Sequence, residues 1–222
     1  MSRVIKKLLS GLLLLGVSTF AAQAQEQSYQ SVNPQQPTMA QPGKIEVLEF
    51  FWYGCPHCYS MESHVEKWLE TKAADVEFIR LPAVLNKVWM AHARAYYTAQ
   101  KLDVLNQIHR PLFDAMHKEK RKIMSEDELR DFFVEKGVKA EDFTRTFTSH
   151  EVEIRVKQAY VLAQNYRLTG VPAFIVNGKY ATSGQLAGTY ENIVITINTL
   201  IDMERGEAAA AAAAAPTPAP AN

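Results

Sequence analysis

Cysteine is scarce in this chain of 222 residues, where Cys55 and Cys58 are the only two. A structural disulfide stabilises a fold most when it closes a long loop, and only two residues separate this pair. A zinc ribbon would need a second cysteine pair, which the sequence does not contain. We therefore predict that the two cysteines are reactive rather than structural.

The sequence also lacks an excess of charge of one sign and a metal-binding pattern of histidines. Its 24 basic and 24 acidic residues balance, which does not favour a nucleic-acid-binding function. No metal site is expected, because five histidines without paired spacing are interpreted as surface or hydrogen-bonded residues: His64, His92, His109, His117 and His150.

A single long apolar run is present, and it lies at the N-terminus. Basic residues precede the run Leu8–Val17, and the small-residue pattern Ala22-Gln23-Ala24 follows it. These parts are typical of a cleaved secretory signal, so residues 1–24 are excluded from the fold. The run is too short to span a bilayer comfortably and no second one follows, so we expect an exported chain without a membrane anchor.

The folded part is expected to begin with a β-α-β unit. The segment Lys44–Trp52 is a nearly continuous apolar run with β-branched and aromatic residues, which predicts a central strand covered on both faces. Apolar residues recur at helical spacing from Pro56 onward, and a second strand is predicted at Val76–Leu81, ending at Pro82.

A wholly helical pattern follows between about residues 86 and 167. A capping box at Ser125 and Glu128 predicts the start of one helix, and Gly137 predicts its end. Pro111 is expected to kink or interrupt another helix.

Strand character then returns at Ala173–Val176, followed by the hairpin turn Asn177-Gly178 and a short strand at Lys179–Thr182. A last helix, which presents apolar residues on one face, is expected to stop at Gly206. The Ala- and Pro-rich residues 207–222 are interpreted as a tail without a core.

The motif Cys55-Pro56-His57-Cys58 lies where the first predicted strand leads into the first helix. Pro56 suits the first helical position, because the N–H that it lacks would be unpaired there. Cys55 is therefore predicted at the N-cap, where free backbone N–H groups favour its thiolate. A helix end contributes ~1 kcal/mol, less than one pKa unit, so we expect further donors: the thiol and amide of Cys58 and protonated His57.

A stable thiolate at Cys55 favours the reduced protein, and this makes its disulfide a strong oxidant. The pattern Cys-x-x-Cys alone also occurs at zinc sites, so the prediction depends on its place at a helix start. We predict a thiol-disulfide oxidoreductase that donates its disulfide to other proteins.

A second motif, Thr169-Gly170-Val171-Pro172, directly precedes the strand at Ala173. Proline in a sheet is usually confined to an edge or to the first residue of a strand, so an ordinary strand start would also explain Pro172. The presence of the cysteine motif in the same chain favours a functional role.

Two segments of the sequence, VLEFFWYGCPHCY at Val47–Tyr59 and GVPAFIVNGKY at Gly170–Tyr180, resemble the DsbA family of disulfide donors. The resemblance implies an α/β, thioredoxin-like fold with an inserted all-helical domain. The expected organisation is a signal peptide (1–24), a leading arm with one short strand (25–43), a thioredoxin-like domain (44–83 and 168–206), a helical insertion (84–167) and a disordered Ala/Pro tail (207–222).

The resemblance also implies how such a protein works. A substrate thiolate attacks Cys55, a mixed disulfide is resolved, and a DsbB-like membrane quinone reductase reoxidises the enzyme. The implied substrates are reduced, unfolded exported proteins, and the implied compartment is the periplasm. No cofactor is expected beyond the redox-active disulfide of Cys55 and Cys58, and the chain is expected to be a monomer.

Further site residues are implied by the same resemblance. In thioredoxin-like folds the loop before this strand carries a cis proline, which assigns Val171 and Pro172 to substrate binding. Glu49 matches a buried glutamate proposed to manage the proton of the inner cysteine, and burial would raise its pKa. The alternative is a strand glutamate that reaches water or a lysine. The family's lysine partner is not clearly matched, and Arg80 is the nearest basic residue in the second strand.

Aromatic residues flank the cysteine motif, and we interpret Trp52, Tyr53 and Tyr59 either as an apolar rim for unfolded substrates or as simple packing. Four other functions remain open at this point. They are a disulfide isomerase, a reductase of the thioredoxin type, an exported copper-binding protein that uses both cysteines and a histidine, and a peptide-binding chaperone without redox activity.

Overall fold

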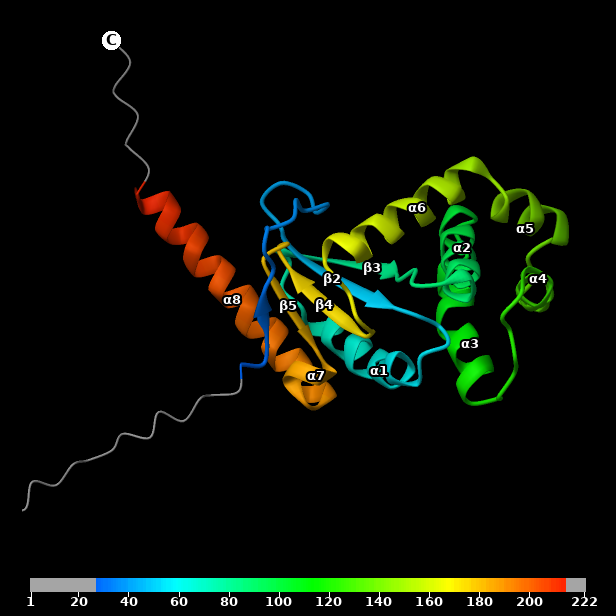
Figure 1. Ribbon diagram of the computed structural model, residues 1–222, viewed down its shortest axis with the longest axis horizontal. Helices are drawn as coiled ribbons and strands as arrows, with labels where there is room; N and C mark the ends of the chain where they lie inside the picture. Colours follow the sequence, from blue (N-terminus) through cyan, green and yellow to red (C-terminus); the bar gives the residue numbers. More distant parts are fainter. Residues whose placement is uncertain (1–26, 215–222) are drawn as a thin grey trace, which may run out of the picture.

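A computed structural model of the chain describes residues 27–214, which form a mixed sheet with helices on both faces and a group of helices at one end (Figure 1). The predicted signal peptide and the last residues of the predicted tail lie outside the described residues. None of the helices in this described part is both long enough and apolar enough to cross a membrane.

The sheet has five strands within residues 27–214, and the predicted central strand lies inside it. β2 (Ile45–Phe51) pairs in parallel with β3 (Val76–Pro82) and antiparallel with β4 (Ala173–Val176). β5 (Tyr180–Ser183) pairs with β4, and the short β1 (Gln30–Ser31) pairs with β5, which gives the order β1-β5-β4-β2-β3. The predicted β-α-β unit and hairpin are confirmed.

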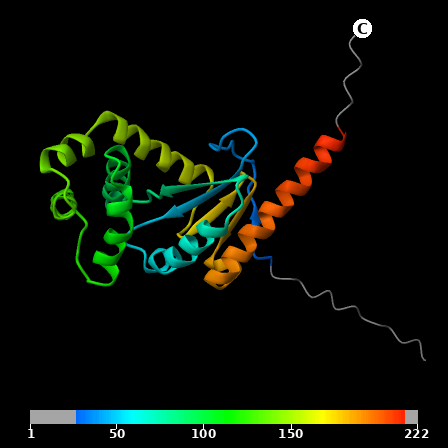
Figure 2. The ribbon, with the colours of Figure 1, turned by 180° about the vertical axis from the view of Figure 1, so that it is seen from behind.

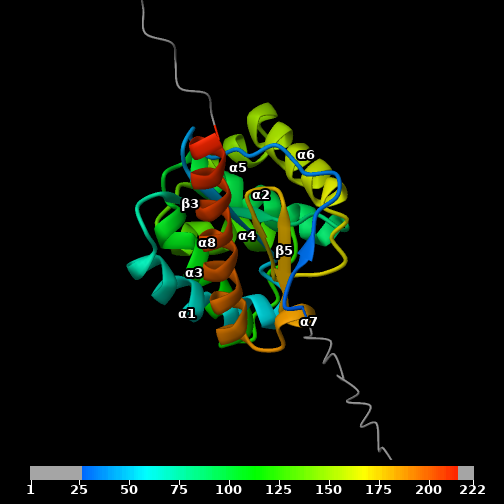
Figure 3. The same ribbon diagram turned by 90° about the vertical axis from the view of Figure 1, so that its left-hand side faces the viewer.

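Helices cover both faces of the sheet, and this explains why β2 is apolar almost throughout. α1 (Pro56–Thr71) and α8 (Tyr190–Ala214) pack side by side on one face (Figures 1 and 2). In the view turned by 90°, α8 crosses in front of the sheet (Figure 3). Val47 belongs to the core under these helices, whereas Leu48 belongs to the core on the opposite face, beside the end of α6 (His150–Asn165).

The helical insertion has its own core, and that core continues into the end of β2. Four helices precede α6: α2 (Lys87–Lys101), α3 (Leu105–His117), α4 (Glu126–Glu135) and α5 (Ala140–Phe147). Their buried aromatic and aliphatic side chains form one cluster with Phe51, Tyr53 and both cysteines. The cysteine motif therefore lies at the junction of the sheet and the insertion.

Several predicted helix caps and turns are present in the structure. Ser125 and Glu128 form the predicted reciprocal capping box of α4, and Gly137 follows that helix with φ of 90°. Asn177 and Gly178 both have positive φ in the hairpin turn. Any Cβ at Gly178 would lie 2.1 Å from the Gln36 carbonyl oxygen, so the leading arm also requires glycine there.

The predicted interruption of a helix at Pro111 and the predicted end of the last helix are both wrong. α3 runs through Pro111 without interruption, because Ile108, Leu112 and Phe113 on either side of it are buried in the helical core, and a kink at Pro111 stays a prediction. α8 does not stop at Gly206 but continues to Ala214, so the predicted tail boundary at residue 207 lies inside a helix. Alanine has the highest helix propensity, and the alanine run can extend a helix already packed on the sheet. The short α7 (Gly184–Ala187) was not predicted.

Candidate active site

The cysteine motif has the predicted position at the start of α1. Cys55 is the N-cap residue with extended backbone angles (φ −89°, ψ 117°), and Pro56 occupies the first turn. The Cys55 N–H donates a hydrogen bond to the Trp52 carbonyl oxygen at 3.0 Å, which ties the motif to the end of β2. Both thiols are free, so the structure shows the reduced form.

The two sulfurs differ in their access to solvent. Cys55 retains 8% of its surface exposed, whereas Cys58 on the inner side has none. A substrate can therefore reach Cys55 but not Cys58. This difference agrees with the predicted roles of an attacked outer cysteine and a resolving inner one.

The environment of Cys55 favours its thiolate. A hydrogen bond from the Cys58 thiol makes the largest contribution, and it lowers the pKa of Cys55 to about 6 against the opposing effect of burial. The backbone N–H groups of Cys58 and His57 act in the same direction, followed by the charge of His57. The predicted donors therefore all take part, with the neighbouring thiol first and the His57 charge last.

Cys58 shows the opposite behaviour. Burial raises the pKa of the Cys58 thiol well above its ordinary value, and the hydrogen bond to Cys55 raises it further, as does the charge of Glu49 when that residue is ionised. Cys58 therefore holds its proton at neutral pH while Cys55 loses its own.

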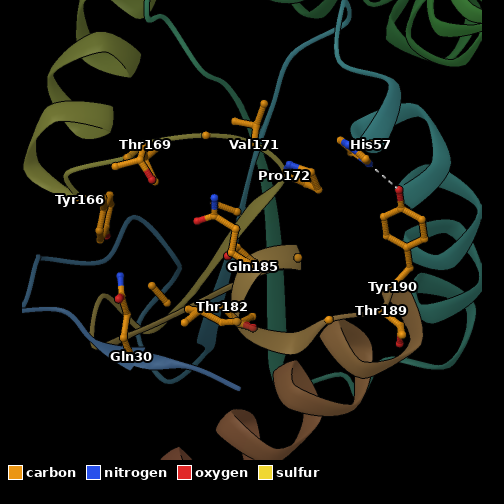
Figure 4. Close-up of a pocket in the computed structure, with 18 of the residues that line it drawn as sticks. Gln30, His57, Tyr166, Thr169, Val171, Pro172, Thr182, Gln185, Thr189 and Tyr190 are labelled. Carbon is orange, nitrogen blue, oxygen red and sulfur yellow. Dashed lines mark hydrogen bonds between the residues drawn. The ribbon is translucent and has the colours of Figure 1, made fainter. Parts of the chain in front are cut away.

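His57 contacts the start of α8. Its Nδ1 lies 3.0 Å from the hydroxyl of Tyr190, as the dashed line in Figure 4 shows. Tyr190 was not identified from the sequence, because it is 133 residues away from His57 and has no local motif. The contact orients the His57 ring above the groove described below.

The second motif lies directly beside the first. The peptide bond between Val171 and Pro172 is cis, as the resemblance implied. The Val171 carbonyl oxygen lies 3.4 Å from Cys55 Sγ, although 116 residues separate the two. The loop before β4 therefore forms one wall of the cysteine site.

A groove opens next to this loop. It has a volume of about 810 Å³, and Figure 4 shows His57, Val171, Pro172, Gln185 and Tyr190 among the residues that line it. The loop before β4, the segment from β5 into α7 and the start of α8 supply most of its lining. Val171, whose carbonyl oxygen lies beside Cys55, belongs to this lining.

The structure separates the aromatic residues that flank the motif. Trp52 is half-buried, and its ring stacks on Trp89 with 4.5 Å between centroids and 10° between planes. Its substrate role stays a prediction. The prediction is wrong for Tyr53, whose side chain is fully buried and whose hydroxyl lies 2.8 Å from His109 Nδ1. Tyr59 is half-buried and donates a hydrogen bond to Asp114.

His92 holds Trp52 in place and must be neutral to do so. Its Nδ1 accepts a hydrogen bond from Trp52 Nε1–H at 2.8 Å, so the proton is on Nε2, 2.7 Å from the Ile123 carbonyl oxygen. Burial lowers the pKa of His92, which agrees with this assignment. The Trp52 ring also covers Gly54, where a Cβ would lie 2.3 Å from the ring.

We expect His92→Leu to lower the free energy of unfolding by about 2–4 kcal/mol, because it leaves the Trp52 N–H and the Ile123 carbonyl without partners in a buried place. Urea unfolding followed by circular dichroism measures this change. His150→Leu, at an exposed position, is the control and should change stability by no more than ~0.5 kcal/mol. Equal losses in the two variants would contradict the prediction.

Glu49 is fully buried, and Arg80, the nearest basic residue of the second strand in the sequence, lies close to it. Arg80 Nε lies 3.1 Å from Glu49 Oε2 across the pair β2 and β3. Burial outweighs this partner and raises the pKa of Glu49 to about 8. Arginine therefore occupies the place where the family resemblance implied a lysine, and the second interpretation, a glutamate that reaches water, is wrong.

Sequence reasoning missed two further buried polar residues, Glu62 and His109. Glu62 lies 3.1 Å from Arg80 Nη2 and 3.4 Å from His109 Nε2. The helical spacing contained a usable signal, because Glu62 follows Cys58 by one turn on the face of α1 that also carries Met61 and Val65. His109 similarly follows the buried Ile108 in α3.

The chemistry of the site resides in the two sulfurs. Disulfide exchange moves two electrons between sulfur pairs and needs thiolate formation and proton transfer at the cysteines. Within residues 27–214, no three His, Cys, Asp or Glu side chains gather in a way that could hold a metal ion.

Comparisons with known proteins agree with this geometry. The family model for the DSBA-like thioredoxin domain matches residues 78–190. The chain is 41% identical over 170 residues to the thiol:disulfide interchange protein DsbA of Pseudomonas aeruginosa, which covers 77% of this chain and 81% of that protein. It is 38% identical to DsbA of Pseudomonas syringae pv. tomato, with 92% of this chain and 96% of that protein covered.

A solved structure extends the likeness to the fold. The crystal structure of Pseudomonas aeruginosa DsbA superimposes with a TM-score of 0.77 at 40% identity, covering 82% of this chain and 94% of that one. The predicted α/β, thioredoxin-like fold with a helical insertion is thereby confirmed. This chain belongs to the DsbA family, and it is a thiol-disulfide oxidoreductase that introduces disulfides into other proteins.

Proposed function

We propose that Cys55 is the sulfur that substrates attack and that Cys58 is the leaving and resolving sulfur. The observation that carries this assignment is the opposite shift of the two pKa values at the start of α1, with Cys55 lowered to about 6 and Cys58 raised by burial. Only a pair with this difference releases the outer sulfur as a stable thiolate and keeps the inner one as a thiol.

The exchange proceeds in two displacements. A substrate thiolate attacks Cys55 Sγ, the bond to Cys58 breaks, and Cys58 leaves as a thiolate that must take up a proton. A second substrate thiolate then attacks the substrate sulfur of the mixed disulfide, and Cys55 leaves as a thiolate. Two electrons pass from the substrate to the enzyme, and the low pKa of Cys55 makes it a good leaving group.

Several neighbours support these steps. Pro56 begins the helix that places backbone N–H groups near Cys55, and His57 adds a positive charge when it is protonated. Glu49 is assigned to proton exchange with Cys58, because it is buried, influences the Cys58 thiol and has a pKa raised to about 8. A group with this pKa is protonated at neutral pH and can still lose its proton.

The substrate is an extended, unfolded segment bound along the groove of about 810 Å³. Backbone groups of Val171 beside Cys55 would pair with the segment, and Pro172 would limit how closely it approaches. The half-buried Trp52 is assigned to the rim near the same cysteine. This recognition through backbone groups suits substrates of many sequences.

The expected place of action is the periplasm, supported by the signal-like pattern at residues 1–24. A DsbB-like membrane quinone reductase would reoxidise a monomeric enzyme by exchange with the Cys55 thiolate. Cell fractionation that finds the protein only in the cytoplasm would contradict the proposed location. Reoxidation that is equally fast with quinone-free membranes would contradict the proposed partner.

The redox equilibrium with glutathione tests the direction of the reaction. A disulfide donor should stay largely reduced in mixtures in which thioredoxin-type reductants are already oxidised. Purified oxidised protein should also form disulfides in a reduced, unfolded substrate. An equilibrium in the reductant range would overturn the proposal, and tight copper binding by the reduced protein that is lost in Cys55→Ser would favour a metal-binding function.

When Cys55 of a Cys58→Ala variant is first joined to glutathione in a mixed disulfide, a substrate thiolate should displace glutathione and remain bonded to Cys55, because the Cys58 sulfur that could expel the substrate is missing. The same change removes the donor that contributes most to the low pKa of Cys55, so that pKa should rise. Cys58→Ser is the matched control, because it traps substrates equally but retains a hydroxyl donor and should keep the pKa lower than the alanine variant does. Mass spectrometry detects the adducts, and their absence from both variants would contradict the assigned roles.

A further inference from the structure

A network of buried polar contacts connects Glu49 to the segment that precedes Cys55. Arg80 contacts two carboxylates, with Nε 3.1 Å from Glu49 Oε2 and Nη2 3.1 Å from Glu62 Oε2. Glu62 Oε1 lies 3.4 Å from His109 Nε2, and His109 Nδ1 lies 2.8 Å from the Tyr53 hydroxyl. Strands β2 and β3, helices α1 and α3 and the segment before the motif each contribute one residue.

The charges in this network do not balance if the carboxylates of Glu49 and Glu62 are both ionised. Glu49 and Glu62 share a single guanidinium, and neither side chain is exposed by more than 1%. Two buried carboxylates beside one fixed positive charge favour a state in which one of them keeps its proton. The two carboxylates differ in their second neighbour. In residues 27–214, Arg80 is the one ion-pair partner of Glu49, whereas Glu62 Oε1 also lies 3.4 Å from His109 Nε2; neither Oε1 atom makes a hydrogen bond there.

The tautomer of His109 follows from its two neighbours. Burial raises the pKa of Tyr53, so its hydroxyl keeps its proton and donates to His109 Nδ1. Burial lowers the pKa of His109, so the ring is neutral and its one N–H is at Nε2, which lies 3.4 Å from Glu62 Oε1 without forming a hydrogen bond to it. Burial opposes the ionisation of Glu62, but His109 and Arg80 outweigh it and lower its pKa.

We infer that Glu62 and His109 are positioning residues for the proton that Glu49 exchanges with Cys58. Glu62 takes a share of the Arg80 guanidinium, and the N–H of His109 holds Glu62 in its ionised form. Glu49 is left with an incompletely compensated carboxylate and retains the proton. This inference rests on the proposed role of Glu49 and names the residues that make Glu49 able to perform it.

Other charged and titratable groups act electrostatically on the residues of this network. Cys58 and Glu66 approach it from α1, Tyr96 from α2 and Arg110 from α3. Each belongs to an element that packs against these residues, but within the described residues only Arg80 contacts both carboxylates. Removing the Glu62 carboxylate should therefore leave the Arg80 guanidinium paired with Glu49 alone.

The consequence is different for the two halves of the cycle. When a substrate attacks Cys55, the departing Cys58 thiolate takes the proton of Glu49. When Cys58 later attacks a mixed disulfide on Cys55, its thiol gives the proton to the Glu49 carboxylate, the new bond to Cys55 forms, and the partner leaves as a thiolate. An ionised Glu49 slows the first step and speeds the second.

The test compares Glu62→Gln and His109→Phe with the wild type. Both changes release Arg80 toward Glu49, the second because Glu62 then loses the neighbour that lowers its pKa and keeps its proton. Both should move the titration of Glu49 down by ~1–3 pH units. Infrared difference spectra of the protonated carboxyl follow Glu49, and Glu49→Gln identifies its band. The two variants change different elements, so a folding failure in one leaves the other as a test.

Kinetics at pH 7 provide a second readout. Disulfide transfer to a substrate should be slower in Glu62→Gln, whereas release of glutathione from a preformed Cys55 mixed disulfide should be faster. Glu70→Gln removes an exposed charge from the same helix and should leave both rates and the Glu49 titration unchanged.

An unchanged Glu49 titration in both variants, or equal slowing of both half-reactions, would overturn the inference. A different result would contradict the proposed role of Glu49 itself: unchanged rates of disulfide transfer and of glutathione release in Glu49→Gln.

Discussion

Replacing Cys55 by alanine is expected to reduce disulfide transfer to the rate seen without enzyme. Cys55 is the sulfur with exposed surface and with the Val171 wall of the groove beside it. Cys58 is then the one remaining cysteine, and a single thiol has no disulfide bond that a substrate thiolate could break; it also has no exposed surface. The loss of thiols from a reduced, unfolded substrate measures the rate.

The same experiment needs a variant that changes α1 without touching the sulfurs. Ser60→Ala alters an exposed position one turn after Pro56 and removes a hydroxyl that bonds only to the Pro56 carbonyl oxygen. It should retain nearly full activity, and circular dichroism should show that the Cys55 variant is folded. Transfer by folded Cys55→Ala protein would show that the enzyme uses another sulfur.

A second large effect is expected in the pH dependence of the reduced protein. Thiolate absorbance should titrate with a midpoint near 6, in place of the ordinary cysteine value of 9.0. The titration should be absent from Cys55→Ser. A midpoint near 9 in the wild type would remove the physical basis for a strongly oxidising disulfide.

The sign of this effect follows from linkage. The pKa of Cys55 is depressed in the folded protein, so the thiolate stabilises the reduced form fully above pH 9 and loses this effect as the pH falls through about 6. At pH 7 the thiolate at Cys55 favours the reduced form about tenfold, which corresponds to ~1.4 kcal/mol or ~30 mV for a two-electron couple. The glutathione equilibrium should therefore become less dependent on pH below about 6.

Two variants rank the causes of the low pKa. Cys58→Ala should raise the midpoint more than His57→Leu does, because the thiol hydrogen bond contributes most and the His57 charge least among the groups that lower it. A larger effect of the histidine would mean that the helix start and its charge, rather than the neighbouring thiol, hold the thiolate.

Sequence patterns predicted the local parts of this protein well. Cys55 at an N-cap, the capping box of α4 and the Asn177-Gly178 turn each depend on residues within a few positions of one another. Hydrogen bonds between near neighbours decide these features, so a short segment contains all the information that they need.

The predictions that failed depended on surroundings that a short segment does not contain. Tyr53 reads as an aromatic rim residue until the helical insertion covers it, and its exposed surface is then zero. Pro111 should interrupt an isolated helix, but burial on both sides of it keeps α3 continuous. In both cases the packing of the insertion against the end of β2 outweighs the local preference.

By itself, the sequence determined the reactive pair, the strand-to-helix junction that carries it and the family to which the chain belongs, because these are encoded in continuous segments. Only the tertiary structure decided the partners of Glu49, since Arg80 is 31 residues from Glu49 and 18 from Glu62. The sheet register and the docking of α3 on α1 bring these groups together. Their burial then makes one guanidinium insufficient for two carboxylates, which is a property of the folded interior and not of any segment.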